Sequence, residues 1–401
     1  MRRTDLLVLG AGPAGAATAI RAARAGLAVT LVDRARFPRD KACSEYMSPE
    51  TLRHLHAFGV LPALEASGGV AIAGTTVTGP RGSALTGLFA GAGKPFRPTG
   101  LSLPRLVLDA ALVDAARRAG ATVLEEHTVT DLLNERGAVA GAAVRAGDGT
   151  VRLLHARLTV GADGLRSIVA RRIGHRRHGV PARLAFVAHV ADVPGLTDRA
   201  ELHVTPEGYA GLNPIGGGLA NVALVVPWHR AAEARGGGLR FAIAALDRIP
   251  GVRGRVRADR VVRPFLVTGP FAARSRRVVT EGALLVGDAA EFFDPFTGEG
   301  ICAAFRGAEL AVESAVAALE TSGPVSAAQL SGYAARRRAE FLGKWTIERM
   351  IGWGMLAPAL FDRAISRIDR RGWADTLIGV TGDFIPPGAV LNPRFLAGMV
   401  W

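Results

Sequence analysis

Apolar and small residues at the start of the chain follow a strand, turn, helix and strand pattern. An apolar run over residues 5–9 ends in a glycine-rich turn, and small residues with helical character follow over 16–26. A second apolar run over 28–32 stops at Asp33. This succession, within about 30 residues, is typical of the βαβ unit that binds a dinucleotide.

Three glycines in the turn have the spacing of a dinucleotide fingerprint. Gly10 permits the tight turn, Gly12 lets a pyrophosphate approach the backbone, and Gly15 lets the helix pack closely on the strand. The helix N-terminus offers N–H donors and positive potential to the phosphates, and Asp33 stands where a carboxylate binds ribose hydroxyls. A secretory signal would need neither these glycines nor the acid, so the pattern favours a nucleotide site.

The middle of the chain changes to short alternating runs. Residues 70–100 are rich in Gly, Thr and Pro and predict β-hairpins, 106–119 predict a helix, and 129–147 predict strand, turn and strand. The longest alternating runs predict an antiparallel meander, chemically unlike the first unit. They span 184–193, 200–204, 209–215 and 219–226.

Two more apolar strands end in a glycine and an acid. The first leads into Gly161, Asp163 and Gly164, where the aspartate is equally consistent with a helix cap. The second leads into Gly287 and Asp288. A Pro- and Gly-rich stretch and a long helix, predicted to run through residue 320, follow this second strand, which suggests free backbone donors at the start of that helix.

A polar loop over residues 34–46 separates Asp33 from the next helix, which Ser48 and Pro49 are suited to start. Because rigid elements hold both of its ends, the loop has the setting of a functional loop. A solvated basic loop is the alternative interpretation.

Composition limits the classes of function. The 401 residues, 49% hydrophobic and 21% charged, are typical of a globular protein with two or three domains. The net charge of +14 comes almost entirely from arginines scattered along the chain, without a nucleic-acid-binding motif, so we expect no nucleic-acid partner. Two cysteines provide neither a disulfide framework nor a metal site, which suggests a reducing cytoplasm and no metal.

The segment 344–371 mixes tryptophan, isoleucine and leucine with basic residues. Such a pattern suits an interfacial helix at a membrane surface, or a docking face for an acidic carrier protein. Helices that cover an ordinary core are the favoured interpretation.

Taken together, these motifs resemble those of FAD-dependent oxidoreductases of the p-hydroxybenzoate hydroxylase group, and within it the geranylgeranyl reductase-like branch. The resemblance extends to about residue 320. It implies FAD, with NAD(P)H as electron donor. It also implies an α/β fold in which a Rossmann-like FAD-binding domain of the glutathione reductase type carries an inserted antiparallel-sheet substrate domain and a helical C-terminal tail.

The resemblance also implies a division of the chain and a set of cofactor residues. The FAD-binding domain would comprise 1–70, 101–180 and 265–340, the substrate domain 71–100 and 181–264, and the C-terminal segment 341–401. The residues expected to contact FAD are Gly10, Gly12, Pro13, Ala14, Gly15, Asp33, Arg34, Lys41, Ala42, Cys43, Arg105, Val129, Asp163, Gly164, Gly287, Asp288, Pro295, Gly298, Glu299, Gly300 and Ile301.

The reaction depends on where the sequence departs from its relatives. Geranylgeranyl reductases carry an aromatic-x-Trp-x-x-Pro segment, whereas this chain has Gly211 at the Trp position between Tyr209 and Pro214. The Trp-x-Trp-x-Ile-Pro segment of flavin halogenases is also missing. We therefore expect a monooxygenase that hydroxylates an aromatic or polyketide-like metabolite through a flavin C4a-hydroperoxide. Reduction of C=C bonds in a prenyl or lipid substrate is the main alternative, and a non-catalytic FAD-fold protein that binds a lipid or partner is a third.

No catalytic triad or carboxylate pair is evident in the sequence. The implied flavin would itself carry the difficult chemistry. Tyr46 and Tyr209 are the candidate polar groups that face the substrate, although each is also consistent with a half-buried structural tyrosine. His189 and His203 lie on alternating strands and are candidate pocket residues, with a structural role as the alternative.

Overall fold

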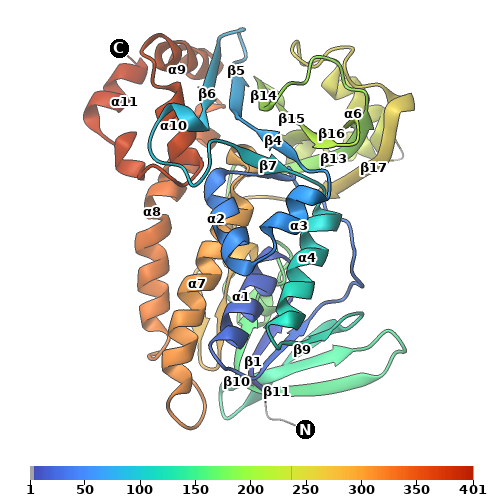
Figure 1. Ribbon diagram of the computed structural model, residues 1–401, viewed down its shortest axis with the longest axis vertical. Helices are drawn as coiled ribbons and strands as arrows, with labels where there is room; N and C mark the ends of the chain where they lie inside the picture. The colour runs from blue at the N-terminus through green and yellow to red at the C-terminus, as the bar shows by residue number, and fades with distance from the viewer. Residues whose placement is uncertain (1–3, 236, 401) are drawn as a thin grey trace.

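Five parallel strands form the centre of the first sheet, in the lower half of Figure 1. The computed structural model describes residues 4–235 and 237–400. The order of these strands is β20-β11-β1-β2-β8, with β19 antiparallel at one edge. Their bounds are β1 (Thr4–Leu9), β2 (Val29–Val32), β8 (Thr122–Leu124), β11 (Val151–Gly161), β19 (Val279–Thr280) and β20 (Ala283–Leu285).

Both faces of this sheet are covered, which explains why β1 is a continuous apolar run. Alternate side chains of a strand point to opposite faces. Leu6 and Val8 pack under helices α1 (Pro13–Arg24), α4 (Arg105–Arg118) and α7 (Gly300–Leu319). Leu7 and Leu9 pack under the hairpin of β9 (Thr128–Glu135) and β10 (Ala138–Arg145) with helix α5 (Ile168–Arg172).

The second sheet has seven strands and lies in the upper half of Figure 1. Its order is β17-β13-β16-β15-β14-β5-β6, and every pair is antiparallel except β14 with β5. The bounds are β5 (Gly74–Thr78), β6 (Ala84–Leu88), β13 (Arg183–Ala191), β14 (Arg199–Thr205), β15 (Gly208–Gly216), β16 (Leu219–Pro227) and β17 (Val261–Thr268).

The alternating pattern of β13 gives this sheet two different faces. Leu184 and Phe186 pack in the core under helix α6 (Gly238–Leu246), whereas Ala185 and Val187 face the opposite side. The predicted meander holds for β14, β15 and β16. β13 pairs with β16 rather than with β14, its neighbour in the chain, so the meander covers three of the four strands.

Short elements connect the two large sheets. The predicted hairpin within 70–100 is the pair β5–β6, whereas the outer strands of that stretch join a separate three-stranded sheet, β3-β7-β4. The remaining short elements are α2 (Pro49–Phe58), α3 (Leu61–Ala66), β3 (Tyr46–Met47), β4 (Val70–Ile72), β7 (Gly100–Ser102), β12 (Arg176–His178), β18 (Ala273–Ser275) and β21 (Glu291–Phe292). The 3₁₀ turns are η1 (Phe89–Gly91), η2 (Trp228–Ala234), η3 (Ala258–Arg260), η4 (Gly287–Ala289), η5 (Pro295–Thr297) and η6 (Pro387–Ala389).

Four helices complete the chain: α8 (Ser331–Gly354), α9 (Pro358–Arg370), α10 (Ala374–Thr381) and α11 (Pro393–Val400). Apolar residues of this segment, such as Ile347, Ile365 and Ile368, are buried in a core that includes Val77 of β5 and Leu85 of β6. The favoured interpretation, helices that cover a core, is therefore confirmed for these side chains.

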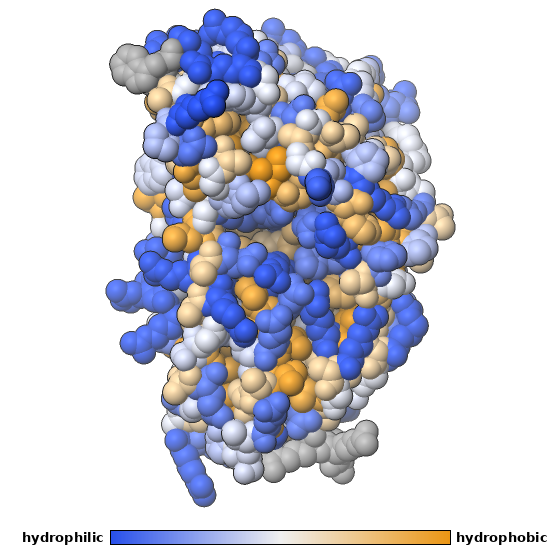
Figure 2. Space-filling view, turned by 60° about the vertical axis from the view of Figure 1, so that its left-hand side comes forward, coloured by the Kyte–Doolittle hydropathy of each residue, from blue (hydrophilic) through white to orange (hydrophobic). Residues whose placement is uncertain are grey.

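Other apolar side chains of α8 and α9 point outward. Trp353 of α8 is 48% exposed and Leu360 of α9 is 45% exposed. On the face that Figure 2 shows, apolar side chains stand among hydrophilic ones. Contact of the C-terminal helices with a membrane surface or an acidic carrier stays a prediction. Within residues 4–235 and 237–400, every helix is too short or too polar to span a bilayer.

The glycine turn after β1 depends on very close backbone packing. Gly10 has φ +101°, and a Cβ there would lie 2.5 Å from the carbonyl oxygen of Ala162. A Cβ on Gly15 would lie 1.7 Å from the carbonyl oxygen of Gly10. Neither contact can relax by rotation of a side chain, because backbone atoms make both.

We therefore predict that Gly15→Ala destabilises the fold itself. The unfolding free energy should fall by about 3 kcal/mol or more, at or above the upper end of ordinary overpacking, measured by denaturant titration of the flavin-free protein. Gly307→Ala on α7 is the control, because nothing lies within 4 Å of its added Cβ. It should leave stability unchanged or raise it by up to about 1 kcal/mol, and an equal loss in both variants would contradict the packing argument.

Candidate functional site

One cavity connects the glycine turn of the first sheet with the inner face of the second sheet. Its volume is about 540 Å³, which is within the range of cofactor and substrate pockets. Gly12, Asp163 and Asp288 follow three different strands, and all three line this cavity. Because β1, β11 and β20 are parallel neighbours, their carboxyl ends meet at one edge of the sheet, where open α/β sheets bind ligands.

Most of the residues predicted to contact the cofactor lie in the wall of this cavity, as do both candidate tyrosines. They are Gly12, Pro13, Ala14, Arg34, Lys41, Ala42, Cys43, Tyr46, Arg105, Asp163, Gly164, Tyr209, Asp288, Pro295, Gly298, Gly300 and Ile301.

The other predicted residues lie outside the lining: Gly10, Gly15, Asp33, Val129, Gly287 and Glu299. Several of them shape the wall from behind. Gly287 has φ +56°, and a Cβ there would lie 2.7 Å from Cβ of Ala14, so this glycine lets η4 approach α1. Val129 lies on β9 and packs against the core of the hairpin, and its role toward a cofactor stays a prediction.

Asp33 braces the glycine turn. One carboxylate oxygen accepts a hydrogen bond from the backbone N–H of Ala11 at 2.7 Å, and the other accepts from Ala35 at 2.9 Å. Each carboxylate oxygen has a second lone pair, so the side chain still has acceptor capacity for a ribose. The structure thus adds a backbone-holding role to the role predicted from sequence.

Asp163 caps the helix that follows it. Its carboxylate accepts from the hydroxyl of Ser167 at 2.6 Å and from the backbone N–H of Ile168 at 2.6 Å. Burial raises the pKa of this carboxyl, and the same hydrogen bonds oppose the rise. The capping interpretation is therefore supported, and the same residue lines the cavity, where its contact with FAD stays a prediction.

Lys41 and Asp288 bring opposite charges to the cavity wall. Burial lowers the pKa of the Lys41 ammonium, Arg105 lowers it further, and Asp288 raises it. A Cβ on Gly164 would lie 3.5 Å from Nζ of Lys41, so the lysine is close to the Asp163-Gly164 turn. Positive and hydrogen-bonding groups so placed suit the phosphates and hydroxyls of a dinucleotide.

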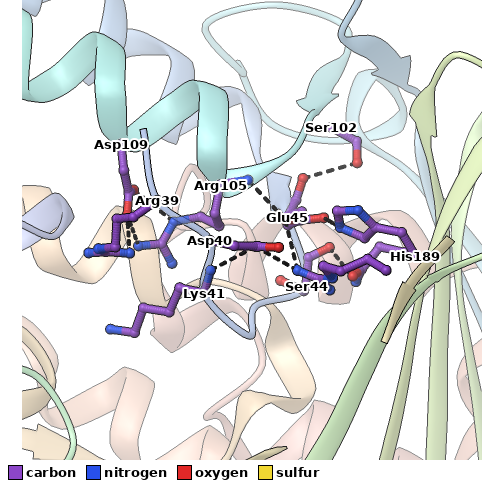
Figure 3. A network of polar contacts seen from close by, with 11 residues as sticks. Arg39, Asp40, Lys41, Ser44, Glu45, Ser102, Arg105, Asp109 and His189 are labelled. Carbon is purple, nitrogen blue, oxygen red and sulfur yellow. Dashed lines mark hydrogen bonds and ion pairs between the residues drawn. The ribbon is translucent and has the colours of Figure 1, made fainter. Parts of the chain in front are cut away.

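A buried cluster of two arginines and one aspartate supports the loop over residues 34–46 (Figure 3). Arg105 binds Asp109 through two hydrogen bonds of 2.8 Å, and Arg39 pairs with the same carboxylate at 2.8 Å. The Asp109 side chain is fully buried. Burial lowers the pKa of the Arg105 guanidinium, but Asp109 opposes this effect and the pKa is raised overall. The arginine therefore stays charged beside the cavity.

Glu45 is a second buried support that the sequence gave no reason to expect (Figure 3). It has φ +58° and a fully buried side chain. One carboxylate oxygen accepts from the backbone N–H of Arg105 at 2.9 Å, and the other lies 2.6 Å from Nε2 of His189 on β13. A lone glutamate in a polar loop has no sequence signature, so only the fold reveals this role.

The second sheet holds the same loop by further hydrogen bonds. Asn221 donates to the carbonyl of Ser44 at 2.9 Å, and Asn213 donates to the hydroxyl of Ser102 at 2.7 Å. Ser102 in turn donates to the carbonyl of Glu45. These contacts favour a functional loop over a merely solvated one, because they fix its backbone between the two sheets.

The two candidate tyrosines have different surroundings. Tyr209 donates to Asp294 at 2.6 Å, and Arg183 pairs with the same carboxylate at 2.8 Å. The hydroxyl of Tyr209 is therefore directed to a buried ion pair, although its ring lines the cavity. Burial raises the pKa of Tyr46 well above its ordinary value, so this phenol stays protonated.

The N-terminus of α7 points its free backbone donors toward the cavity. Gly298, with φ +72°, and Gly300 line the wall at the start of this 20-residue helix. The first N–H groups of a helix have no partner within it and carry positive potential. The start of α1 at Pro13 contributes a second such end.

These features suit an extended, anionic cofactor. An added Cβ at Gly12 would meet only the Arg39 guanidinium, at 3.7 Å, so the backbone there is open to a phosphate. Two helix N-termini and the cations Lys41 and Arg105 share one wall with Asp288. The fold and this wall define a dinucleotide-binding oxidoreductase.

Comparison with known proteins identifies the class. The FAD binding domain family matches residues 3–341. Menaquinone reductase of Mycolicibacterium smegmatis is 32% identical over 342 residues, covering 81% of this chain and 78% of the relative. Digeranylgeranylglycerophospholipid reductase 2 of Methanothermobacter thermautotrophicus is 32% identical over 375 residues, covering 91% of each.

Solved structures share the fold at lower identity. A flavoprotein/dehydrogenase from Cytophaga hutchinsonii has a TM-score of 0.83 and 21% identity, covering 98% of this chain and 94% of the other. The myxobacterial chondrochloren halogenase CndH has a TM-score of 0.80 and 22% identity, covering 96% of this chain and 98% of the other.

The chain belongs to the FAD binding domain family, and it is an FAD-dependent oxidoreductase. The predicted family, fold class and cofactor are confirmed. The predicted contacts of individual residues with FAD stay predictions.

The Arg105–Asp109–Arg39 cluster yields a stability prediction. Asp109→Asn keeps the shape of the side chain but leaves two arginines without their anion, so the unfolding free energy of the flavin-free protein should fall by about 3–5 kcal/mol. Asp114→Asn on the same helix is the control, because its pair with Arg117 is exposed and should contribute less than about 1 kcal/mol. Denaturant titrations that gave equal losses would show that the buried cluster is not a support.

Proposed function

We propose that this enzyme reduces C=C bonds of a substrate that carries an isoprenoid chain. The observation that carries the proposal is the apolar wall that the second sheet gives the cavity. Aliphatic and aromatic side chains from four strands and one loop contribute to it. They are Ala185, Val187, Leu202, Ala223, Val225, Leu266 and Phe271.

Several polar side chains of the same wall use their donors on partners within the protein. Tyr209 donates to Asp294, Asn213 donates to Ser102, and Asn221 donates to Ser44, while Oδ1 of Asn221 has no hydrogen-bond partner among the described residues. Glu201 also lines the cavity and pairs with Arg255 at 2.6 Å. A hydroxylated aromatic substrate would need free polar partners to orient it, whereas a hydrocarbon chain needs only apolar surface.

The relatives favour the same class of substrate. Their names, menaquinone reductase and digeranylgeranylglycerophospholipid reductase, specify a lipid quinone and a phospholipid with geranylgeranyl chains. Both are at least 30% identical to this chain over most of its length. The structural neighbours, at 21% and 22% identity, support the fold and not a reaction.

The protein's own residues would position the substrate and supply the proton that it takes up. Bound FAD, reduced by NAD(P)H, supplies a hydride equivalent. The start of α7 would stabilise negative charge at the cofactor, and the second sheet would hold the chain of the substrate. Tyr46 lines the cavity with its phenol protonated and is the candidate proton donor to the second carbon.

Hydroxylation of an aromatic or polyketide-like metabolite is the second candidate. The residue that favours it is Gly211 of β15, which stands where geranylgeranyl reductases carry tryptophan. Gly211 lines the cavity, and an added Cβ would meet Leu202 at 3.5 Å. Without the tryptophan, the cavity has room for a compact ring as well as for a chain.

The requirement for oxygen distinguishes the two candidate reactions, C=C reduction and hydroxylation. Under anaerobic conditions, protein reduced with dithionite should reoxidise on addition of a polyprenyl quinone or an unsaturated isoprenoid lipid, with a product that gains two hydrogen atoms by mass spectrometry. A phenolic library under air with NADPH is the parallel arm. Oxygen incorporation there, with no anaerobic turnover of any isoprenoid, would replace the proposal with hydroxylation.

Gly211 gives a test of the apolar wall. Gly211→Gln should lower kcat/KM for a long-chain substrate at least about tenfold, or about 1.4 kcal/mol, because an unpaired amide would enter the apolar wall, while FAD affinity stays unchanged. Gly211→Ala is the matched control and should differ little, since its Cβ makes an ordinary contact. Unchanged long-chain kinetics in Gly211→Gln would place the substrate elsewhere.

A further inference from the structure

The carboxyl group of Glu299 lies behind the cavity wall. Its neighbours Gly298 and Gly300 line the cavity, but Glu299 does not. The residue is 2% exposed. One carboxyl oxygen accepts from the hydroxyl of Ser48 at 2.8 Å, and Oε1 has no hydrogen-bond partner among the described residues.

Helices beyond the region of family resemblance surround this carboxyl. One carboxylate oxygen of Glu299, one of Asp383 and Sγ of Cys302 all lie within 4.8 Å of one another. Lys344 of α8 forms an ion pair with Asp383, which follows α10. The lysine ammonium thus supplies positive charge to the cluster, and the carboxylate of Asp383 and the thiol of Cys302 lie beside the Glu299 carboxyl.

This arrangement favours the uncharged form of Glu299. A buried carboxylate with an unpaired oxygen is costly, whereas a protonated carboxyl can donate a hydrogen bond from that oxygen. Burial raises the pKa of Glu299 to about 8, Lys344 opposes the rise, and Asp383 adds to it. Burial also raises the pKa of Cys302 well above its ordinary value, so the thiol stays neutral.

Other charged groups face the same site from every side. Glu50 of α2 contributes negative charge and raises the pKa of Glu299. Burial raises the pKa of Glu348 on α8 to about 7, and Lys344 lowers it. Tyr46 of β3 remains a neutral phenol. Lys344 is a firm cation at this site, because Asp383 raises its pKa against the effect of burial. Arg337 of α8 lines the same hollow as Glu299 and Lys344 and is a second cation.

We propose that the C-terminal helices leave Glu299 able to bind a proton behind the start of α7, so that reduction of the bound FAD, at a pH where this carboxyl is ionised in the oxidised protein, takes up a second proton there. A charge on Glu299 would oppose the positive potential of the helix N-terminus. Negative charge on the reduced cofactor in turn raises the affinity of Glu299 for a proton. Glu299 is a positioning residue in this role, since it does not touch the cavity.

The balance is simple. Two electrons and one proton, from a nicotinamide hydride or from dithionite with solvent, convert oxidised FAD to its anionic reduced form. Where Glu299 is ionised in the oxidised protein, its carboxylate takes one further proton from solvent. The midpoint potential then falls by about 59 mV instead of about 30 mV per pH unit, because a two-electron couple changes by about 29.6 mV for each tenfold change in equilibrium.

Redox titration of the FAD-loaded protein against pH tests the proposal without any substrate. From pH 6 to 9.5, with dithionite and mediators, the wild-type slope should become up to twice as steep above about pH 8, and Glu299→Gln should keep the shallow slope throughout. Asp383→Asn should move the steeper region to lower pH, and Lys344→Met to higher pH.

Glu313→Gln is the matched control, because Glu313 lies on the same helix with its side chain 52% exposed and should behave as wild type. A Glu299→Gln protein with the wild-type profile would overturn the proposal, as would a steeper region that Asp383→Asn leaves in place. If Asp383→Asn does not fold, the near-isosteric Glu299→Gln variant decides alone. The result does not depend on whether the enzyme reduces or hydroxylates its substrate.

Discussion

Close backbone packing at the carboxyl ends of three parallel strands is the constraint on which the site depends. β20, β11 and β1 are neighbours in the sheet, so the turns after them must share one edge. The turn at Gly10 packs on the backbone at Ala162, and Gly287 packs on Ala14. With so little space between the turns, their backbone donors and acids point into one cavity, and this convergence turns three weak motifs into one cofactor site.

The loop over residues 34–46 transmits that constraint to the second sheet. Glu45 connects the start of α4 with His189 of β13, and Asn221 of β16 holds Ser44. The apolar face of the second sheet is therefore fixed relative to the cofactor wall by buried hydrogen bonds, and those to the Glu45 carboxylate are of the stronger, charge-assisted kind. Such support gives a large cavity a defined shape even though hydrocarbon side chains form much of its wall.

The sequence predicts those parts of the molecule that local patterns determine. The glycine turn, the cap of α2 at Ser48, the hairpin of β9 and β10, and the strands of the second sheet all follow from short-range periodicity and turn chemistry. The position of β13 beside β16 does not, because strand order depends on packing between distant segments. The buried partners of Asp109 and Glu45 are likewise outside the reach of sequence, since a charged residue in a loop or on a helix is usually solvated.

The C-terminal segment is another region where the sequence pattern did not predict the contacts of its charged residues. Its mixture of basic and apolar residues suggests a surface that meets a partner, yet Lys344 and Asp383 turn inward and meet Glu299 at the start of α7. Lys344 neutralises Asp383, and burial favours the uncharged form of Glu299 although the lysine opposes it. In our proposal, helices that cover the core adjust the charge of the cofactor wall from behind, through a carboxyl group outside the cavity lining.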